Sequence, residues 1–384
     1  MDYAARLARL RERMEAADVD LVYLTRGANL FYLTGIRRQL VHGTDHNAYG
    51  DWATGAYVGR DGGVIVVAPR MGGAFFAAEG AGKPWVDRVR LILESEAPLD
   101  VMRDAIASVC PRGMRRLAVD DHAWAETSLA LRSLMPSATV SLASSLVMPL
   151  RMIKDADELE AMRRASAVAD LVWERTVPFL RVGVTEYEVA REVDYQFQIA
   201  GAEYTSFETG ISFWGAAETG GDVLRSGHAR RLQPGDSVTF DFGCVLDGYC
   251  SDFGRCAFVG EPPGEYRRVH ELVLAAQAAG MGAMRAGQVT AAEVNAAARR
   301  VIAEAGYDAA FTHRLGHAIG VTVHEPPFLD VMDHTVLQEN MLFTVEPSVF
   351  IPGRLGNRVE DVVRVAAGGG VALNRAPHDL ALVG

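Results

Sequence analysis

One change in the order of the predicted helices and strands, near Met148-Pro149, constrains the fold of this chain more than any other feature. Before this point, short β-like runs such as 20–25 alternate with helical segments such as 99–109. Alternation of this kind is typical of an α/β layer domain. We therefore predict an α/β N-terminal domain over residues 1–148.

After this point, two helical segments precede a group of β-like segments, and the same order then occurs a second time. The helical segments are expected over residues 153–177, 186–200, 266–284 and 291–305. The repeated order predicts an α+β domain over residues 149–384 with an internal duplication of its architecture. A length of 384 residues also suits two domains.

The composition excludes several classes of partner. The formal net charge is −11, whereas nucleic acids and anionic membranes both select a basic face. No apolar run approaches the roughly 20 residues that a bilayer requires, and the first residues lack the apolar core of a signal peptide. Four cysteines make no disulfide framework in a chain of this size. We therefore expect a cytoplasmic protein that binds neither nucleic acid nor membrane.

Two aspartates flank a predicted hairpin turn. Asp247-Gly248 is a turn signal between two β-rich runs, and Asp241 and Asp252 lie almost equally far from it. To within a residue of register, we expect them to face each other across the ladder, with side chains about 5 Å apart. Opposed carboxylates repel unless positive charge lies between them, and a pair of divalent metal ions supplies that charge. The alternative is a solvent-exposed Asp252 whose pairing with Asp241 is accidental.

Three histidines, His313, His317 and His324, lie within twelve residues among glycines and apolar side chains. A single histidine is more often structural, but three together predict a site lined by imidazoles. His313 and His317 have the spacing of a zincin pair on one helix face. The required glutamate is absent, however, and the glycines oppose a helix.

Glu346 and Glu360 each lie inside an apolar, β-branched run, where a charged residue rarely occurs without a partner. For Glu360 alone, pairing with Arg358 is an adequate alternative. Together the five candidate ligands make an oxygen-rich set that suits two ions of Mn, Co, Fe or Zn. Two such ions can bridge and deprotonate a water molecule and stabilise the oxyanion that forms after its attack. The candidate ligands are Asp241, Asp252, His317, Glu346 and Glu360.

This pattern resembles the ligand signature of the pita-bread metallopeptidases, which include Xaa-Pro dipeptidase (prolidase), aminopeptidase P and methionine aminopeptidase, with creatinase as a metal-free relative. The matching motifs are Asp241-x10-Asp252, His313-x3-His317-x6-His324, Glu346-Pro347 and Arg358-x-Glu360-Asp361. Residues 29–35 and 151–159 resemble the two-domain prolidase and aminopeptidase P branch. The resemblance therefore covers nearly the whole chain.

The resemblance implies a creatinase-like N-terminal domain, a pita-bread catalytic domain with a pseudo-twofold axis, and usually a homodimer. It also implies a dinuclear metallopeptidase with two divalent ions. Mn is the metal expected first, and Co, Zn or Fe are alternatives. Asp241 would hold one ion, Asp252 and Glu360 would bridge both, and His317 and Glu346 would complete the site. Glu346 would also act as the proton acceptor, and His324 and His313 would contact the scissile carbonyl and the substrate backbone. Arg358 completes the expected catalytic residues.

Departures from the family pattern concern the substrate. Leu224 replaces a substrate-contacting histidine, and His228 is the only histidine nearby. Phe328 stands where some dipeptidases place an arginine for the free carboxylate of the dipeptide. Phe328 cannot donate a hydrogen bond, so we predict that Xaa-Pro dipeptides are poorer substrates than longer peptides or a small amide. The alternative is that a loop of a partner subunit supplies Arg37 or Arg38.

The polar stretch 42–52 is unusual for this family. It is either a surface loop or a segment whose His46 and Trp52 reach a neighbouring subunit's active site. Two other functions stay open: hydrolysis or lysis of a small non-peptide substrate on the same scaffold, and a catalytically silent binding module. The intact ligand set disfavours the last.

Overall fold

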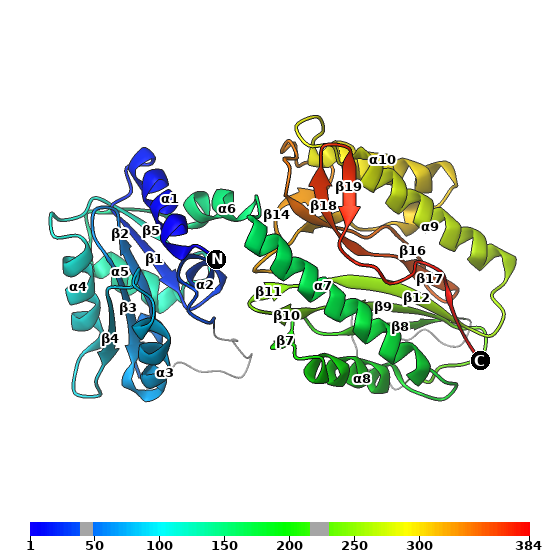
Figure 1. Cartoon of the computed structure of the whole chain (residues 1–384), viewed down its shortest axis with the longest axis horizontal. Helices are drawn as coiled ribbons and strands as arrows, with labels where there is room; N and C mark the ends of the chain where they lie inside the picture. Colours follow the sequence, from blue (N-terminus) through cyan, green and yellow to red (C-terminus); the bar gives the residue numbers. More distant parts are fainter. Residues whose placement is uncertain (39–48, 216–229) are drawn as a thin grey trace. The chain divides into compact units, whose positions relative to one another are not determined.

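The computed structural model describes residues 1–38, 49–215 and 230–384 (Figure 1). Its contacts divide the chain into two compact units, Met1–Arg151 and Met152–Gly384. His46, Leu224 and His228 lie outside the described residues.

The first unit is built on a six-stranded sheet with the order β4-β3-β2-β1-β5-β6. Its strands are β1 (Leu21–Thr25), β2 (Gly55–Gly59), β3 (Val64–Pro69), β4 (Arg88–Ile92), β5 (Arg116–Val119) and β6 (Thr139–Leu142). Strand β2 pairs antiparallel with both β1 and β3, and the other pairs are parallel. The helices are α1 (Tyr3–Ala16), α2 (Ala28–Thr34), α3 (Arg70–Ala81), α4 (Pro98–Val109), α5 (Ala125–Leu134) and α6 (Ser144–Arg151). This architecture confirms the predicted α/β domain.

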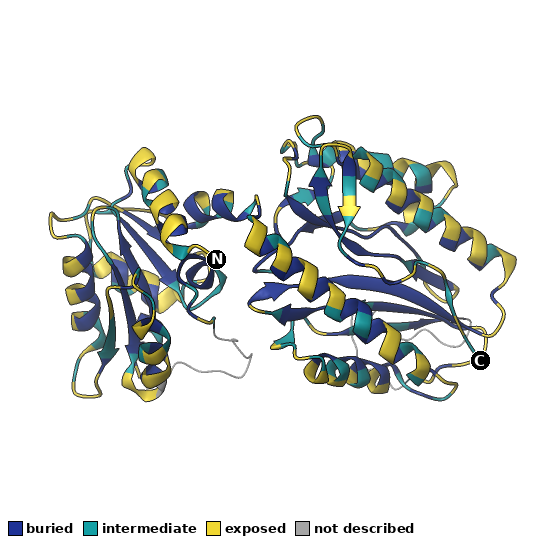
Figure 2. Cartoon of the chain, in the orientation of Figure 1, coloured by how far each residue is buried: buried dark blue, intermediate teal, exposed yellow. Residues whose placement is uncertain are grey.

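The central strands of this sheet are buried, whereas the helices expose one side to solvent (Figure 2). Apolar residues of β1, β2 and β3 pack with residues of α4 and α5 in one core cluster. Burial on both faces explains why these strands read as continuous apolar runs rather than as alternating ones.

In the second unit a helix pair and a sheet occur twice, which confirms the predicted duplication. Helices α7 (Ala156–Thr176) and α8 (Glu186–Ile199) share a core with a sheet of order β20-β12-β9-β8. Helices α9 (Gly264–Ala283) and α10 (Ala291–Glu304) share a core with a sheet of order β14-β13-β15-β18-β19. In Figure 1 the first helix pair is green and the second is yellow.

The strands of the two large sheets are β8 (Gly210–Trp214), β9 (Ser237–Phe242), β12 (Phe253–Val259), β13 (Gly316–Ala318), β14 (Glu325–Leu329), β15 (Leu342–Val345), β18 (Asp361–Ala366), β19 (Gly369–Ala372) and β20 (Ala381–Val383). Three short strands form a separate sheet: β7 (Tyr204–Thr205), β10 (Cys244–Leu246) and β11 (Tyr249–Cys250). A two-stranded ribbon joins β16 (Ser348–Ile351) and β17 (Leu355–Arg358).

Local capping fixes where the helices of this unit begin. Asp155 caps α7, and its side chain accepts a hydrogen bond from the amide of Glu158. The predicted helix from residue 153 therefore began three residues too early. Thr185 and Thr290 form capping boxes with Glu188 and Glu293, and α8 and α10 begin at their predicted residues.

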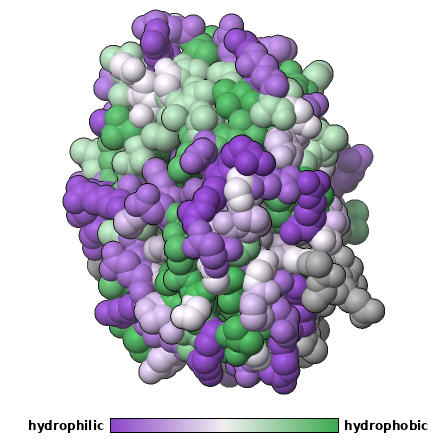
Figure 3. All heavy atoms as spheres, turned by 90° about the vertical axis from the view of Figure 1, so that its right-hand side faces the viewer, coloured by the Kyte–Doolittle hydropathy of each residue, from purple (hydrophilic) through white to green (hydrophobic). Residues whose placement is uncertain are grey.

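None of the helices in the described residues is long and apolar enough to cross a membrane. The face of the second unit seen in Figure 3 carries hydrophilic residues interspersed with hydrophobic ones.

Candidate metal centre

The predicted ligands come from the ends of strands in both sheets of the second unit, and they line one pocket of about 520 Å³. Asp241 lies in β9, His317 lies in β13, and the other ligands lie within one residue of a strand end. The pocket is lined by Phe207, Asp241, Asp252, His313, Arg314, His317, Val323, His324, Asp330, Glu346, Arg358 and Glu360. Every predicted ligand and every predicted catalytic residue is in this set.

The register of the hairpin differs from the predicted one. Asp247 and Gly248 both have positive φ, 50° and 78°, as a type I′ turn requires. The β9–β12 ladder pairs Asp241 with Gly254, so the expectation that Asp241 opposes Asp252 to within a residue was wrong. The two aspartates are two residues out of register because they are unequally distant from the turn. A shift of two residues keeps both side chains on the same face of the ladder.

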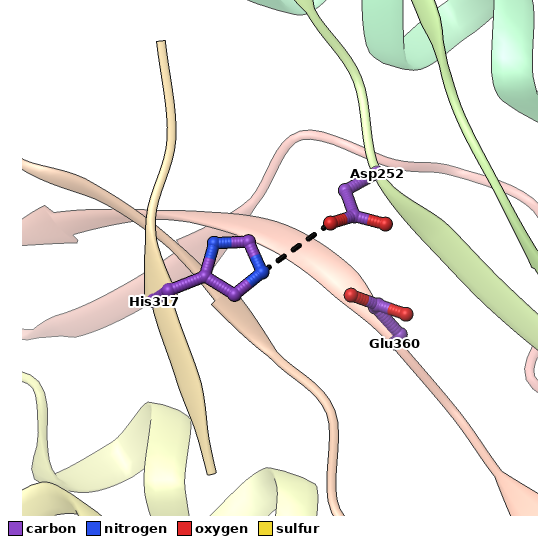
Figure 4. Close-up of side chains that lie close together, drawn as sticks. All are labelled: Asp252, His317 and Glu360. Carbon is purple, nitrogen blue, oxygen red and sulfur yellow. Dashed lines mark ion pairs between the residues drawn. The ribbon is translucent and has the colours of Figure 1, made fainter. Parts of the chain in front are cut away.

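Asp252, His317 and Glu360 form the tightest group in this pocket (Figure 4). One ligand atom from each lies within 4.8 Å of the other two. The Nε2 atom of His317 is 3.4 Å from Oδ2 of Asp252 and 3.5 Å from Oε1 of Glu346. The Nδ1 atom of His317 contacts the carbonyl oxygen of Ala318 at 3.1 Å. With Nδ1 as the donor of this hydrogen bond, Nε2 faces the carboxylates, which is the orientation of a metal ligand. Burial lowers the pKa of His317, but the hydrogen bond with Asp252 and the charge of Glu346 outweigh it, so the net shift is upward.

Backbone contacts hold Glu360 in place. Its amide donates to the carbonyl oxygen of Gly254 at 3.0 Å, and its carbonyl accepts from Nη1 of Arg255 at 2.6 Å. Arg255 is buried and also pairs with Asp361 at 2.7 Å. The sequence analysis missed Arg255, although an arginine inside the apolar run of β12 was a signal for a buried partner.

Two carboxylates of this pocket, those of Asp252 and Glu360, are buried, and their pKa values lie above the usual range. Burial raises the pKa of Asp252 to about 6, and the charge of Asp241 adds to the effect. The pKa of Glu360 is also raised, by burial and then by the charge of Asp252. Oδ1 of Asp252 and Oε2 of Glu360 are buried and have no hydrogen-bond partner among the described residues. Bare buried oxygens of this kind are costly, so the donor set fits hard divalent cations.

Arg358 supplies part of the missing charge. Its guanidinium is ion-paired with the carboxylate of Asp241, and its Nη2 lies 3.7 Å from Oε2 of Glu346. Burial alone would raise the pKa of Glu346, but the charges of Arg358 and His317, with smaller contributions from His313 and Thr344, together outweigh it and the net shift is downward. Glu346 is therefore ionised at neutral pH.

Comparison with known proteins shows the family of this chain. The model of Metallopeptidase family M24 matches residues 160–367, and that of the Creatinase/Prolidase N-terminal domain matches residues 6–153. The chain belongs to metallopeptidase family M24. The expected creatinase-like and pita-bread domains are thereby confirmed.

Several relatives of this M24 chain are similar over nearly their full length. The Xaa-Pro dipeptidase of Lactobacillus helveticus is 30% identical, with 98% of each chain covered. The probable dipeptidase PepE of Mycobacterium tuberculosis is 33% identical, with 99% of this chain and 96% of the relative covered. Among solved structures, a recombinant prolidase from Thermococcus sibiricus superimposes with a TM-score of 0.87 at 28% identity, with 100% of both chains covered.

Two further histidines of this M24 metallopeptidase line the pocket. Burial and the charge of Arg358 lower the pKa of His313 to about 4, and burial and the charge of His317 lower that of His324 to about 4. Both rings are thus neutral at pH 7. The Nδ1 atom of His313 contacts the carbonyl oxygen of Arg314 at 2.6 Å, and Nε2 contacts the hydroxyl of Ser348. One tautomer satisfies both contacts, with Nδ1 as donor and Nε2 as acceptor.

The predicted substrate residues lie in different places. Phe328 is paired with His317 in the β13–β14 ladder, and its ring centroid lies 4.5 Å from the guanidinium of Arg314. Trp52 belongs to the first unit, in the short 3-10 helix η1 (Asp51–Ala53), where it packs against the core of that unit. The sequence analysis missed Arg314, although it lies between the two histidines of a recognised motif.

Proposed function

We propose that this M24 metallopeptidase hydrolyses Xaa-Pro bonds at the N-termini of peptides, as a dipeptidase or aminopeptidase. The observation that carries the proposal is the convergence of Asp252, His317 and Glu360 in a pocket that also holds Glu346 and two neutral histidines. The printed names of its relatives, Xaa-Pro dipeptidase and prolidase, supply the substrate class.

We propose that this pocket binds two divalent metal ions. Mn is the preferred assignment, and Co, Zn or Fe are alternatives. Asp241 would bind one ion, Asp252 and Glu360 both, and His317 and Glu346 would complete the coordination. The bare buried oxygens of Asp252 and Glu360 support this assignment. Such ions generate a nucleophile from water at neutral pH and offset the negative charge that develops on the attacked carbonyl oxygen.

We assign separate catalytic roles to Glu346 and to the side chains around the ligands. Glu346 is ionised and accepts a hydrogen bond from the hydroxyl of Thr344 at 3.1 Å, which orients it as the proton acceptor. His324 is neutral and exposed at the pocket, so it can donate a hydrogen bond to the scissile carbonyl. His313 would contact the substrate backbone, and Arg358 would keep Glu346 ionised.

The test is a substrate screen on purified protein with Mn present. Xaa-Pro dipeptides, Xaa-Pro-Xaa peptides, the same peptides with alanine in place of proline, and small amides are compared by kcat/KM. We expect turnover of proline-containing peptides at least about tenfold above their alanine counterparts, or ~1.4 kcal/mol of transition-state binding. Turnover restricted to a small non-peptide amide would establish the alternative function.

We also propose a homodimer in the cytoplasm. The support is the two-domain prolidase-like organisation, together with four cysteines that are all free. Light scattering at working concentration measures the dimer directly, and a monomer would contradict it.

A further inference from the structure

The two arginines that line the metal pocket differ in what they contact. Arg358 is held in ion pairs with Asp241 and Glu346. The guanidinium of Arg314 forms no ion pair or hydrogen bond with any residue in the described part of the chain, and its aromatic contact is the ring of Phe328, at 4.5 Å. A positive charge on the pocket wall is thus left for a ligand.

The sheet directs Phe328, and with it Arg314, to the metal side. Phe328 lies directly opposite His317 in the β13–β14 ladder, and opposed residues share one face of a sheet. The ring of Phe328 therefore lies on the face from which His317 enters the pocket. Stacking on an aromatic ring holds a guanidinium in place while its N–H groups stay available. The contact between the His313 ring and the carbonyl oxygen of Arg314, at 2.6 Å, fixes the backbone there.

Arg314 forms no ion pair with a carboxylate among the residues that the structure describes. Asp330 also lines the pocket, but one of its oxygens accepts hydrogen bonds from the amides of Met332 and Asp333 at 2.7 and 3.0 Å. Arg314 and His324 are both among the residues that line this pocket. A cation on this wall therefore faces the same pocket as the residue that we assign to the scissile carbonyl.

A dipeptide must bring its free carboxylate next to the scissile bond. Loss of water from that carboxylate costs several kcal/mol unless a cation or several donors replace the water. The acidic ligands of this pocket cannot do so, and Arg358 is occupied. A guanidinium offers paired donors that match a carboxylate.

We propose that Arg314 recognises the free carboxylate of Xaa-Pro dipeptides and makes this chain selective for them, in the role left open by Phe328. The inference rests on the proposed Xaa-Pro activity. It reverses the expectation, drawn from Phe328 alone, that dipeptides are poor substrates, because a residue distant from Phe328 in the sequence supplies the cation.

The test compares two substrates that differ only in this charge, Ala-Pro and Ala-Pro-amide. The parent protein with Mn should prefer Ala-Pro. In Arg314→Gln the ratio of kcat/KM for Ala-Pro over Ala-Pro-amide should fall at least about tenfold, which corresponds to ~1.4 kcal/mol. Arg314→Lys, which keeps a charge but not the planar fork, should give an intermediate ratio. Arg300→Gln, at an exposed position of α10, is the matched control and should leave the ratio unchanged.

A rescue variant distinguishes loss of carboxylate recognition from a general loss of activity. Phe328→Arg combined with Arg314→Gln should restore the preference for Ala-Pro. Both substrates are measured on one preparation, so loss of folded protein cancels in the ratio. An unchanged ratio in Arg314→Gln would overturn the role of Arg314 but not the proposed function. The same holds for a parent that hydrolyses Xaa-Pro-Xaa peptides but prefers Ala-Pro-amide. Hydrolysis of no Xaa-Pro peptide by the parent would overturn the proposed function and this inference with it.

Discussion

The guanidinium of Arg358 is ion-paired with the carboxylate of Asp241 on the wall of the metal pocket. Asp241 is one of the five proposed ligands, yet the tight group contains only Asp252, His317 and Glu360. Arg358 therefore supplies positive charge directly beside Asp241. It is one positive charge in a pocket that also holds the four carboxylates of the proposed ligands.

Loss of the positive charge of Arg358 should destabilise the metal-free protein more than the Mn-bound protein. We expect Arg358→Met to lower the free energy of unfolding by about 1–2 kcal/mol without metal, less than the roughly 3–5 kcal/mol for a fully buried ion pair, because the side chain of Asp241 is 35% exposed. With Mn bound the loss should be smaller, because the ions then neutralise the carboxylates. Urea unfolding with and without Mn measures both values, and Arg268→Met on the exposed side of α9 is the control. Equal losses in the two states would contradict this account.

Removal of metal should abolish activity. We expect dialysis against a chelator to leave less than about 1% of turnover, and Mn or Co to restore it, because the proposed nucleophile depends on the bound ions. Elemental analysis of the same samples gives the number of ions per chain, for which we expect two. Full activity in protein shown to be metal-free would refute the proposal.

Asp252→Asn should lower metal content and activity together. It replaces a charged bridging ligand with a neutral one, and we expect kcat/KM to fall at least about a hundredfold. Asp247→Asn is a matched control on the same hairpin, since asparagine tolerates the φ of 50° at this turn. Retention of two ions per chain in Asp252→Asn would argue against a bridging role.

Glu346→Gln should affect turnover far more than binding. Glu346 is ionised because Arg358, His317 and other neighbours together lower its pKa, and glutamine cannot accept the proton. We expect kcat to fall at least about a hundredfold while KM stays within about threefold. Steady-state kinetics with metal content measured in parallel separates loss of the base from loss of the ligand, and Glu339→Gln at an exposed position is the control. A rise in KM with unchanged kcat would assign Glu346 to binding instead.

The stabilisation by metal should depend on pH. The pKa of Asp252 is raised to about 6 in the fold, from about 3.9 in an unfolded chain. Its contribution to stability is therefore complete below pH of about 4 and lost as the pH rises through about 6. We expect the rise in Tm on adding Mn to be larger at pH 8 than at pH 5, because metal binds the ionised carboxylates. An equal rise at both pH values would show that these carboxylates do not titrate in this range, and Asp252→Asn should flatten the dependence.

Much of the fold could be predicted from the sequence because its signals are local. The capping residues Thr185 and Thr290 lie within three residues of their partners, and α8 and α10 begin where they predict. By contrast, β2 and α3 had no clear signal. Glycines at both ends of β2 and within α3 weaken the propensities on which such a prediction depends.

The sequence by itself also determined which side chains are candidates for the metal site, since carboxylates inside apolar strands require a partner wherever they lie. Only the tertiary structure decided how they meet. Asp241 pairs with Gly254 rather than Asp252, and Arg314 stacks on Phe328. Strand register and contacts between distant segments depend on the packing of whole sheets, which no window of neighbouring residues contains.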